Sequence, residues 1–292
     1  LMNKNAAIIF ALCAVVSAAA GLLSVFSEEP VVELCAFDVG QGDSLFLQTK
    51  NGRQWLVDGG PSSVVLSRLG AKIPPWDRTI DGIILTHPHA DHLVGLISVL
   101  DRYEVGEIIA TDVRYDSPLA GVFEDAAENE RANYRAALSG TVFEEDGVSL
   151  RIVAPGNFYH HQSVSDVNES SVVMELRVDD MKFLLMGDSG EETERALLRE
   201  NVFSKVDILK VGHHGSARGS SSSFLNAIRP AMAIISSGAD NRYGHPHRAT
   251  LDRLQKIGAR IFRTDTDGTV CVSVENGELH TRTRASWIPW WI

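Results

Sequence analysis

The sequence feature that most constrains the fold is a group of metal-binding residue types directly after an apolar strand. Residues 82–86 (GIILT) predict a buried strand and its end, and they are followed at once by His87, His89, Asp91 and His92. A loop leaving a strand can direct the first two side chains to one side, while the last two enter the next helix. Imidazole and carboxylate ligands suit zinc, manganese or iron, and two ions about 3.5 to 4 Å apart can hold a hydrolytic water between them. Because three of only 10 histidines in the chain lie here, coincidence is a poor explanation.

The pattern around this cluster alternates between short apolar strands and helices. Strands are expected at 31–37, 45–47, 55–57, 80–85, 105–110, 149–153, 171–178, 181–186, 206–211, 233–236, at 261, and at 270–274 and 280–283. Helices are expected at 63–69, 92–100, 124–138, 191–200, 224–228 and 249–257. The first three strands predict an antiparallel opening. Runs of strands with helices on both outer faces predict an α/β fold, a four-layer αββα sandwich, and a single hydrolase domain over residues 31–292.

The first 30 residues differ from the rest. After Lys4, residues 6–26 form an uncharged apolar stretch that ends before Ser27 and two glutamates. A run of about 20 apolar residues can span a bilayer, whereas a cleaved signal peptide has a shorter apolar part followed by small residues. The alanines at 18–20 favour cleavage, and the apolar residues beyond them favour an uncleaved anchor. We therefore expect residues 1–30 to be an export segment, with both forms left open, and the rest to be secreted or anchored on the extracellular face of the membrane.

Charge and cysteine content limit the function classes. The 27 basic and 38 acidic residues give a net charge of −11, which argues against a general affinity for polyanions, since that binding needs many Lys and Arg side chains. Any nucleic-acid contact must be local or metal-mediated. Cys13, Cys35 and Cys271 are too few for a disulfide framework or a Cys-rich zinc site. At most one disulfide, Cys35 to Cys271, is expected.

A set of ordered motifs points to a known family. The motifs are FDVGQGDS at 37–44, VDGG at 57–60, LTHPHADH at 85–92, GD at 187–188, LKVGHHGS at 209–216 and GHPH at 244–247. The His-X-His-X-Asp-His part resembles the signature of the metallo-β-lactamase superfamily. The whole set, which spans most of residues 31–292, is similar to the exported metallo-β-lactamase-like domain of the ComEC DNA-uptake proteins and their stand-alone relatives.

This resemblance implies a centre with two divalent metal ions, manganese or zinc. His87 and His89 would hold one ion, Asp91 and His92 the second, and Asp188 would bridge them. Asp188 follows an apolar strand and precedes an expected helix, so capping that helix is its alternative role. The last histidine ligand would be His213. Its neighbour His214 is the alternative, because adjacent residues of an extended segment point to opposite faces.

The first ion lacks one expected histidine. Many superfamily members supply it between the first cluster and the bridging aspartate, where this chain offers only His160 and His161. The expected position is nearer residues 168–170, and the ComEC-like group has a polar Asn/Ser segment there. The resemblance therefore implies an open or oxygen-rich side, which moves the preference from zinc toward manganese.

Three aspartates are candidates for supporting roles. Asp58 ends a strand before two glycines, and we expect it to hydrogen-bond and orient the metal-binding loop, although an Asp-Gly turn is the simpler alternative. Asp38 and Asp43 flank Gly40 and Gly42, and they either buttress the site or form a turn.

Lys210, Ser216, His245 and His247 are candidates for substrate contact. A lysine or histidine beside two metal ions would stabilise charge on a phosphate oxygen or protonate a leaving oxygen. A structural or surface role is the alternative for each of the four.

The leading functional hypothesis is an exported metal-dependent hydrolase, a phosphodiesterase or nuclease acting on DNA through a metal-activated water, with Asp91, Asp188 and His245 as catalytic residues. The resemblance supplies the DNA substrate, since the ligand set alone does not. One alternative is a hydrolase of a small ester, lactone, lactam or choline-phosphate-type substrate, and another is a non-catalytic exported binding module. The expected partners are DNA or another phosphodiester and, if the first segment is uncleaved, the membrane. The sequence indicates no protein partner.

Overall fold

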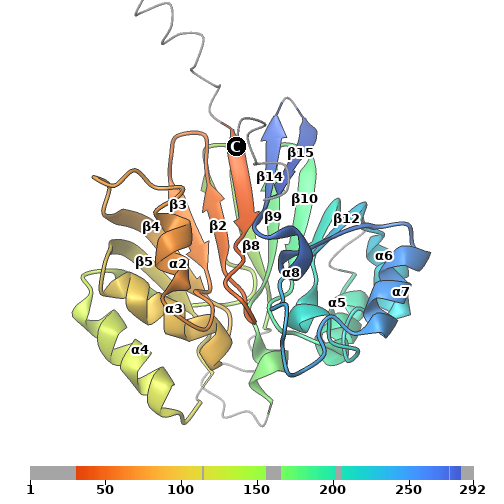
Figure 1. Cartoon of the computed structure of the whole chain (residues 1–292), viewed down its shortest axis with the longest axis horizontal. Coiled ribbons are helices and arrows are strands. Elements are labelled where there is room, and N and C mark those ends of the chain that lie inside the picture. Colours follow the sequence, from red (N-terminus) through yellow and green to blue (C-terminus); the bar gives the residue numbers. More distant parts are fainter. Residues whose placement is uncertain (1–30, 114, 156–165, 202–204, 276, 284–292) are drawn as a thin grey trace, which may run out of the picture. The chain divides into compact units, whose positions relative to one another are not determined.

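Two β-sheets form the inner layers of the computed structural model, which describes residues 31–113, 115–155, 166–201, 205–275 and 277–283 (Figure 1). The strands of the first sheet lie in the order β15 (Glu278–Thr283), β14 (Val270–Glu275), β1 (Val32–Ala36), β2 (Leu45–Gln48), β3 (Gln54–Val57), β4 (Thr79–Leu85), β5 (Glu104–Ala110) and β6 (Asn133–Ala136). The second sheet has the order β13 (Arg260–Arg263), β12 (Met232–Ile235), β11 (Ile208–Lys210), β10 (Met181–Leu185), β9 (Val173–Val178), β8 (Val148–Ala154) and β7 (Val142–Glu145).

Helices cover the outer face of each sheet, as Figure 1 shows. The first sheet carries α2 (Val64–Leu69), α3 (Ala90–Leu100) and α4 (Pro118–Asn129), and the second carries α5 (Glu191–Arg199), α6 (Ser222–Ile228) and α7 (Arg248–Lys256). A short helix, α8 (Thr264–Asp267), follows β13, and two 3-10 turns, η2 (Val167–Ser170) and η3 (Gly212–Gly215), precede β9 and follow β11.

Three apolar cores hold the four layers together. Side chains alternate along β4, so that Ile84 enters the core between the sheets while Ile83 packs with Leu93 and Leu96 of α3. A third core joins the second sheet to its helices through residues such as Phe224 of α6. These layers confirm the predicted four-layer αββα sandwich.

The strand pairing places the site. β1, β2 and β3 pair antiparallel, which confirms the predicted opening. From β3 to β6, and again from β10 to β13, neighbouring strands run parallel. Parallel strands end at the same edge of a sheet. The loop that follows β4 of the first sheet can therefore meet the loops that follow β10 and β11 of the second sheet where these two edges lie together.

The predicted helix at 124–138 is wrong in extent. The helix is α4, which begins at Pro118, where the Ser117 hydroxyl accepts a hydrogen bond from the Ala120 amide at 3.1 Å. It ends at Asn129, and residues 133–136 instead form β6, which pairs with β5. Pairing with the sheet edge overrides the helical tendency of this polar segment. The sequence pattern also missed β7.

Cys35 of β1 and Cys271 of β14 face each other and form a disulfide, which confirms the expected pair. The predicted export segment, residues 1–30, lies outside the described residues. Across the described part of the chain, no helix has both the length and the apolar character needed to cross a membrane. By its contacts, Val31–Ile292 forms one unit.

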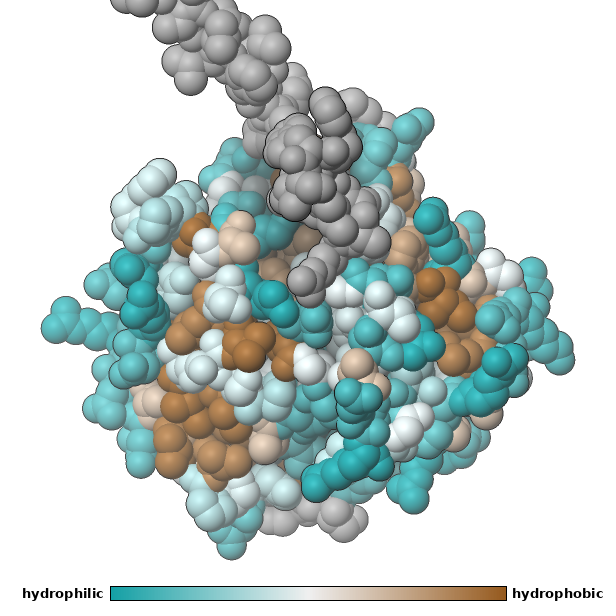
Figure 2. Space-filling view, viewed as in Figure 1, coloured by the Kyte–Doolittle hydropathy of each residue, from teal (hydrophilic) through white to brown (hydrophobic). Residues whose placement is uncertain are grey.

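The surface is mostly polar, with local apolar areas. Val64 of α2 and Leu119 and Val122 of α4 are exposed. Figure 2 shows brown, apolar surface on the side that carries these helices and a smaller area beside α6 and α7.

Candidate metal centre

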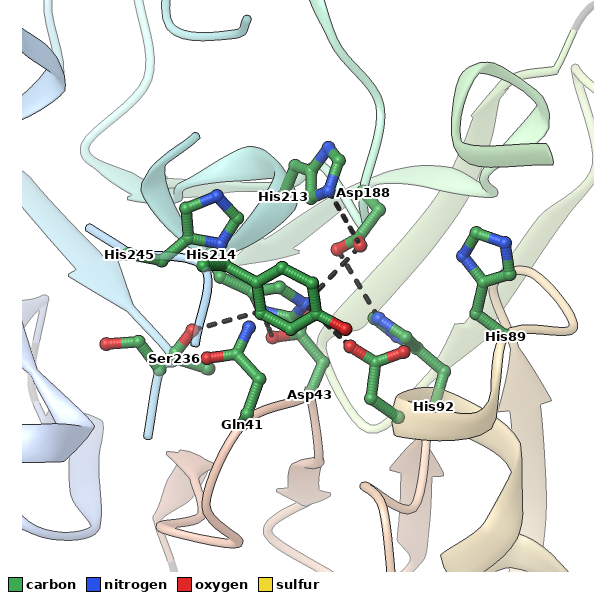
Figure 3. A network of polar contacts seen from close by, with 12 residues as sticks. Gln41, Asp43, His89, His92, Asp188, His213, His214, Ser236 and His245 are labelled. Atoms are coloured by element: carbon green, nitrogen blue, oxygen red, sulfur yellow. Dashed lines mark hydrogen bonds and ion pairs between the residues drawn. The ribbon is translucent and has the colours of Figure 1, made fainter. Parts of the chain in front are cut away.

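The predicted ligands come together at the strand ends of both sheets. The loop after β4 and the start of α3 carry His87, His89, Asp91 and His92, and the second sheet contributes Asp188 after β10 and the histidines of η3 after β11. Figure 3 shows the side chains of His92, Asp188 and His214 pointing toward one another. The centre is therefore shared between the two halves of the sandwich.

His92 is held by Asp58. The ring nitrogen Nδ1 of His92 lies 2.7 Å from Asp58 Oδ2, while Nε2 faces Asp188 Oδ1 at 3.4 Å. Asp58 is fully buried and accepts hydrogen bonds from the Thr86 amide at 2.8 Å and the Thr86 hydroxyl at 2.7 Å. Asp58 thus lies where it can orient the His92 imidazole, which is the role we expected for it.

His87 shows the same arrangement. Its Nδ1 lies 3.1 Å from the Thr86 hydroxyl, and its Nε2 lies 3.8 Å from Asp188 Oδ2 and 3.2 Å from His89 Nδ1. Burial and the neighbouring His92 lower the pKa of His87 well below its usual value, so the imidazole is neutral. His89 is partly buried, and its ring packs edge-on against Tyr115 at 5.6 Å between centroids.

The segment with His213 and His214 is a tight turn rather than the extended chain assumed from the sequence. Both residues have left-handed backbone angles, with φ of 48° and 53°. His214 is buried, with Nδ1 3.1 Å from the Ser236 carbonyl oxygen and Nε2 3.4 Å from both Asp91 Oδ2 and Asp188 Oδ2. His213 is more exposed, and its Nε2 lies 3.8 Å from Asp188 Oδ2. The geometry therefore favours His214 over His213 as a ligand.

The charges of the centre are strongly coupled. Although burial alone would raise it, the pKa of Asp188 is held well below its usual value by His214 and His92. Burial likewise opposes ionisation of Asp91, but His214, whose Nε2 lies 3.4 Å from Asp91 Oδ2, and the charge of His92 lower its pKa to about 2. Both carboxyl groups are thus carboxylates at neutral pH.

Buried atoms without partners test whether this set fits a metal ion. Within the described residues, the buried side-chain atoms that lack a hydrogen-bond partner include His92 Nε2, His214 Nε2, Asp188 Oδ1 and Asp43 Oδ1. Leaving such atoms unpaired costs about 1 to 3 kcal/mol each. The groups of possible ligand atoms that lie within 4.8 Å of one another include His87, His92 and Asp188, and also Asp91, His92 and His214. Converging imidazole nitrogens and carboxylate oxygens fit a divalent metal ion.

Lys210 and Asp43 lie beneath the ligands. Lys210 Nζ donates to Asp43 Oδ2 at 2.6 Å, and both side chains are 2% exposed. Asp43 Oδ1 is 3.4 Å from His214 Nδ1. Asp43 therefore buttresses the centre, and Lys210, predicted as a possible substrate contact, is buried away from solvent.

Three other predicted residues stand apart from the ligands. Asp38 Oδ1 accepts a 3.4 Å hydrogen bond from the Gly40 amide, and its other oxygen is 3.6 Å from Arg68, so it shapes a turn. The Ser216 hydroxyl accepts from the Arg218 amide at 3.3 Å. His247 Nδ1 accepts from the Ala217 amide at 2.9 Å, next to the start of α7.

His245 lies at the rim of the centre. Its ring centroid is 5.6 Å from that of His213 and 6.2 Å from that of His214, and its Nδ1 is buried without a hydrogen-bond partner. Burial, then the charges of His214 and His213, lower its pKa to about 4. His245 is therefore neutral at physiological pH and can accept a proton or a hydrogen bond.

Some contributors escaped the sequence reasoning. Thr86 links Asp58 to His87, and the only signal for it was its position at the end of β4. Ser236 acts through its backbone carbonyl, which no side-chain pattern reveals. Directly after the polar segment 168–170 that was expected near the first ion, the Ser171 hydroxyl accepts a hydrogen bond from the Asp188 amide at 3.1 Å. His160 and His161 lie outside the described residues.

Comparison with known proteins gives a consistent family. Residues 37–238 match the protein family described as "Metallo-beta-lactamase superfamily". ComE operon protein 3 of Bacillus subtilis (strain 168) is 29% identical over 263 residues, which are 84% of this chain and 33% of that protein. Recombination protein 2 of Haemophilus influenzae is 30% identical over 271 residues, 90% of this chain and 32% of that protein. The chain thus spans about a third of the length of these two relatives.

Two further similarities are more limited. Exodeoxyribonuclease WalJ of Streptococcus pneumoniae serotype 2 is 27% identical over 159 residues, which are 53% of this chain and 52% of that enzyme. Among solved structures, the metallo-β-lactamase fold protein YhfI from Bacillus subtilis aligns with a TM-score of 0.56 and 12% identity, covering 86% of this chain and 100% of that one. At this identity the match to YhfI bears on the fold alone.

Proposed function

We propose that this chain, which belongs to the metallo-β-lactamase superfamily of hydrolases, cleaves phosphodiester bonds in DNA with two divalent metal ions. The observation that carries the proposal is the set of buried, unpartnered ligand atoms of His92, Asp188 and His214, which converge from both halves of the sandwich. A non-catalytic binding module has no need of such a costly arrangement.

The substrate part of the proposal comes from the relatives. Two of them are named ComE operon protein 3 and Recombination protein 2, and a third is named an exodeoxyribonuclease. The chain has a net charge of −11, which disfavours the binding of DNA phosphates. A metal centre offsets this repulsion, because divalent ions can hold a phosphate. DNA is therefore preferred over small esters, lactones or lactams.

The residues divide between the two ions as follows. His87 and His89 would hold the first ion, Asp91, His92 and His214 the second, and Asp188 would contact both. Within the described residues, the Asn/Ser segment at 168–170 adds no third imidazole nitrogen to those of His87 and His89, so the first ion would keep an oxygen-rich side. That donor set suits manganese, with zinc as the alternative.

When bound, the two ions would supply a deprotonated water and the positive charge that stabilises the transition state at phosphorus. The protein's own groups prepare this chemistry. Asp58, Thr86 and the Ser236 carbonyl contact the Nδ1 side of His92, His87 and His214 respectively, so that each Nε2 faces Asp188. His245, neutral and at the rim, is placed to accept a hydrogen bond from water or substrate.

Location outside the cytoplasmic membrane is part of the same proposal. Lys4 precedes the apolar residues 6–26, and positive charge tends to stay inside. The Cys35–Cys271 disulfide is typical of proteins in oxidising compartments. A reporter that is active only in the cytoplasm, fused after residue 292, should be inactive. Strong reporter activity would refute this location.

The test of function is direct. The purified chain is incubated with plasmid, linear duplex DNA, single-stranded DNA, a chromogenic phosphodiester, a lactone and a β-lactam, each with manganese, zinc or magnesium. We expect manganese-dependent DNA cleavage that is lost in Asp188→Asn, while circular dichroism shows an intact fold. Turnover of the lactone or β-lactam with no cleavage of DNA would instead favour the small-substrate hydrolase.

A further inference from the structure

The ion pair between Lys210 and Asp43 is unusual for its burial. Both side chains are 2% exposed, and Nζ to Oδ2 is 2.6 Å. Lysine is almost never fully buried unless it is paired, and a buried ion pair often stabilises a fold no better than apolar residues of the same size. Fold stability is therefore a weak explanation for this pair, and its position offers a better one.

The pair joins the two halves of the metal centre. Asp43 lies in the loop between β1 and β2 of the first sheet, and Lys210 is the last residue of β11 in the second. The Asp43 amide donates to the Asp91 carbonyl oxygen at 3.3 Å, and Lys210 Nζ also donates to the Val211 carbonyl oxygen at 3.1 Å. The contact thus links the start of α3, which carries the proposed metal ligands Asp91 and His92, to the turn that carries His214.

Asp43 also has the location of a metal ligand. Its carboxylate lies within 4.8 Å of ligand atoms in two groups, one with Asp58 and His92 and one with Asp188 and His214. Its Oδ1 is buried without a hydrogen-bond partner. What distinguishes Asp43 from the other buried carboxylates of the centre is the ammonium group bound to its second oxygen.

We propose that Lys210 is a fixed internal cation that binds Asp43, holds the two sheets in register beneath the centre, and keeps Asp43 as a positioning residue rather than a metal ligand. The ammonium group lowers the attraction of this carboxylate for a divalent ion, because the two cations compete for one anion at short range. This inference rests on the metal centre and not on DNA as the substrate.

The proposal makes predictions of opposite sign for the two partners. Lys210→Met should raise the affinity for manganese at least about tenfold, because removing one positive charge frees the Asp43 carboxylate. Asp43→Asn should lower it by a similar factor, because the ammonium group is then uncompensated. The double variant Asp43→Asn/Lys210→Met should return close to the wild-type affinity. A purely structural pair would weaken metal binding in both single variants.

The measurement is metal affinity, by competition with a chromophoric chelator, together with the visible spectrum of the cobalt-loaded protein, which reports the ligand number. The matched control is Lys72→Met, which removes another ion pair, to Glu33 at 2.5 Å, and should leave both readouts unchanged. Weaker or unchanged binding in Lys210→Met would overturn the proposal. If that variant does not fold, the double variant must still bind manganese at least about tenfold more tightly than Asp43→Asn, and failure to do so overturns it.

Discussion

At the scale of single residues, three histidines share one design. His87, His92 and His214 each contact the protein through Nδ1 and direct Nε2 into the centre. A hydrogen bond at one ring nitrogen sets which nitrogen is free, and it also fixes the ring orientation. The centre is therefore organised before a metal ion arrives.

The two neighbouring histidines of η3 should differ in metal binding. We expect His214→Gln to lower manganese affinity more than about a hundredfold, because it removes a buried Nε2 between two carboxylates, whereas His213→Gln should cost less than about tenfold. Isothermal titration of both variants checks this. The opposite order would make His213 the ligand.

His245 gives a pH prediction for the metal-free protein. Its folded-state pKa of about 4 lies below the usual 6.5, so on acidification the unfolded chain takes up this proton first. The neutral His245 side chain thus makes its full contribution to the free energy of unfolding above about pH 6.5, and this contribution is lost as the pH falls toward 4. In the presence of a chelator, His245→Gln should lose less unfolding free energy than wild type between pH 7 and pH 5, measured with urea. An identical loss in both proteins would count against the lowered pKa.

Sequence reasoning predicted most of the side chains that converge in this candidate site, but not how they contact one another. The cluster from His87 to His92 and the aspartate after β10 are visible because the residue types and strand ends are local features. The preference for His213 rested on the resemblance, and an extended backbone would have turned His213 and His214 to opposite faces; both residues instead lie in the left-handed turn of η3, which no local pattern indicated. The burial of Lys210 depends on a partner 167 residues away in the chain, which no local pattern could indicate.

At the scale of elements, strand ends and helix starts place the ligands. Alternation and apolar runs predicted the buried strands well, because a strand that is buried carries apolar side chains on its buried face or faces. Segment 133–136 was missed as a strand because its residues are exposed or half-buried, and only pairing with β5 defines it. Helix α3 matters most for function, because Asp91 and His92 lie in its first turn.

Close packing of α3 can be tested at a glycine. A Cβ atom on Gly95 would lie 1.8 Å from the Gly59 carbonyl oxygen, so Gly95→Ala must displace the helix. We expect a loss of at least about 1 to 3 kcal/mol in unfolding free energy and weaker metal binding. Gly121→Ala on α4 is the matched control, since nothing lies within 4 Å of its Cβ position, and it should stabilise by up to about 1 kcal/mol. Equal effects of the two substitutions would contradict the packing described for α3.

At the scale of the whole molecule, the disulfide ties the first strand to the penultimate one across a sequence separation of 236 residues. Because a crosslink between distant residues restricts the unfolded chain, the variant Cys35→Ser/Cys271→Ser should lose about 2 to 5 kcal/mol of unfolding free energy. Reducing agent should lower the stability of wild type to a similar level and leave the variant unchanged. If the bond is reduced and the unfolding free energy of wild type does not change, the disulfide does not contribute to stability.

The charge distribution of the whole molecule predicts how DNA binding depends on salt. The chain has a net charge of −11, Lys210 is buried, and near the motif loops the exposed cations include Arg218 and Arg242. The logarithm of affinity for duplex DNA falls by about 0.9 per neutralised phosphate for each log unit of salt, so about two or three contacts imply a loss of roughly ten- to fortyfold between about 50 and 200 mM salt. A basic track with about six to ten contacts would lose about a thousandfold or more. Titrations of the wild-type protein with labelled DNA that resists cleavage, at fixed free manganese, measure the slope. A steep slope would show that basic side chains act together on one face, and that the metal ions are not the main anchor for the phosphate.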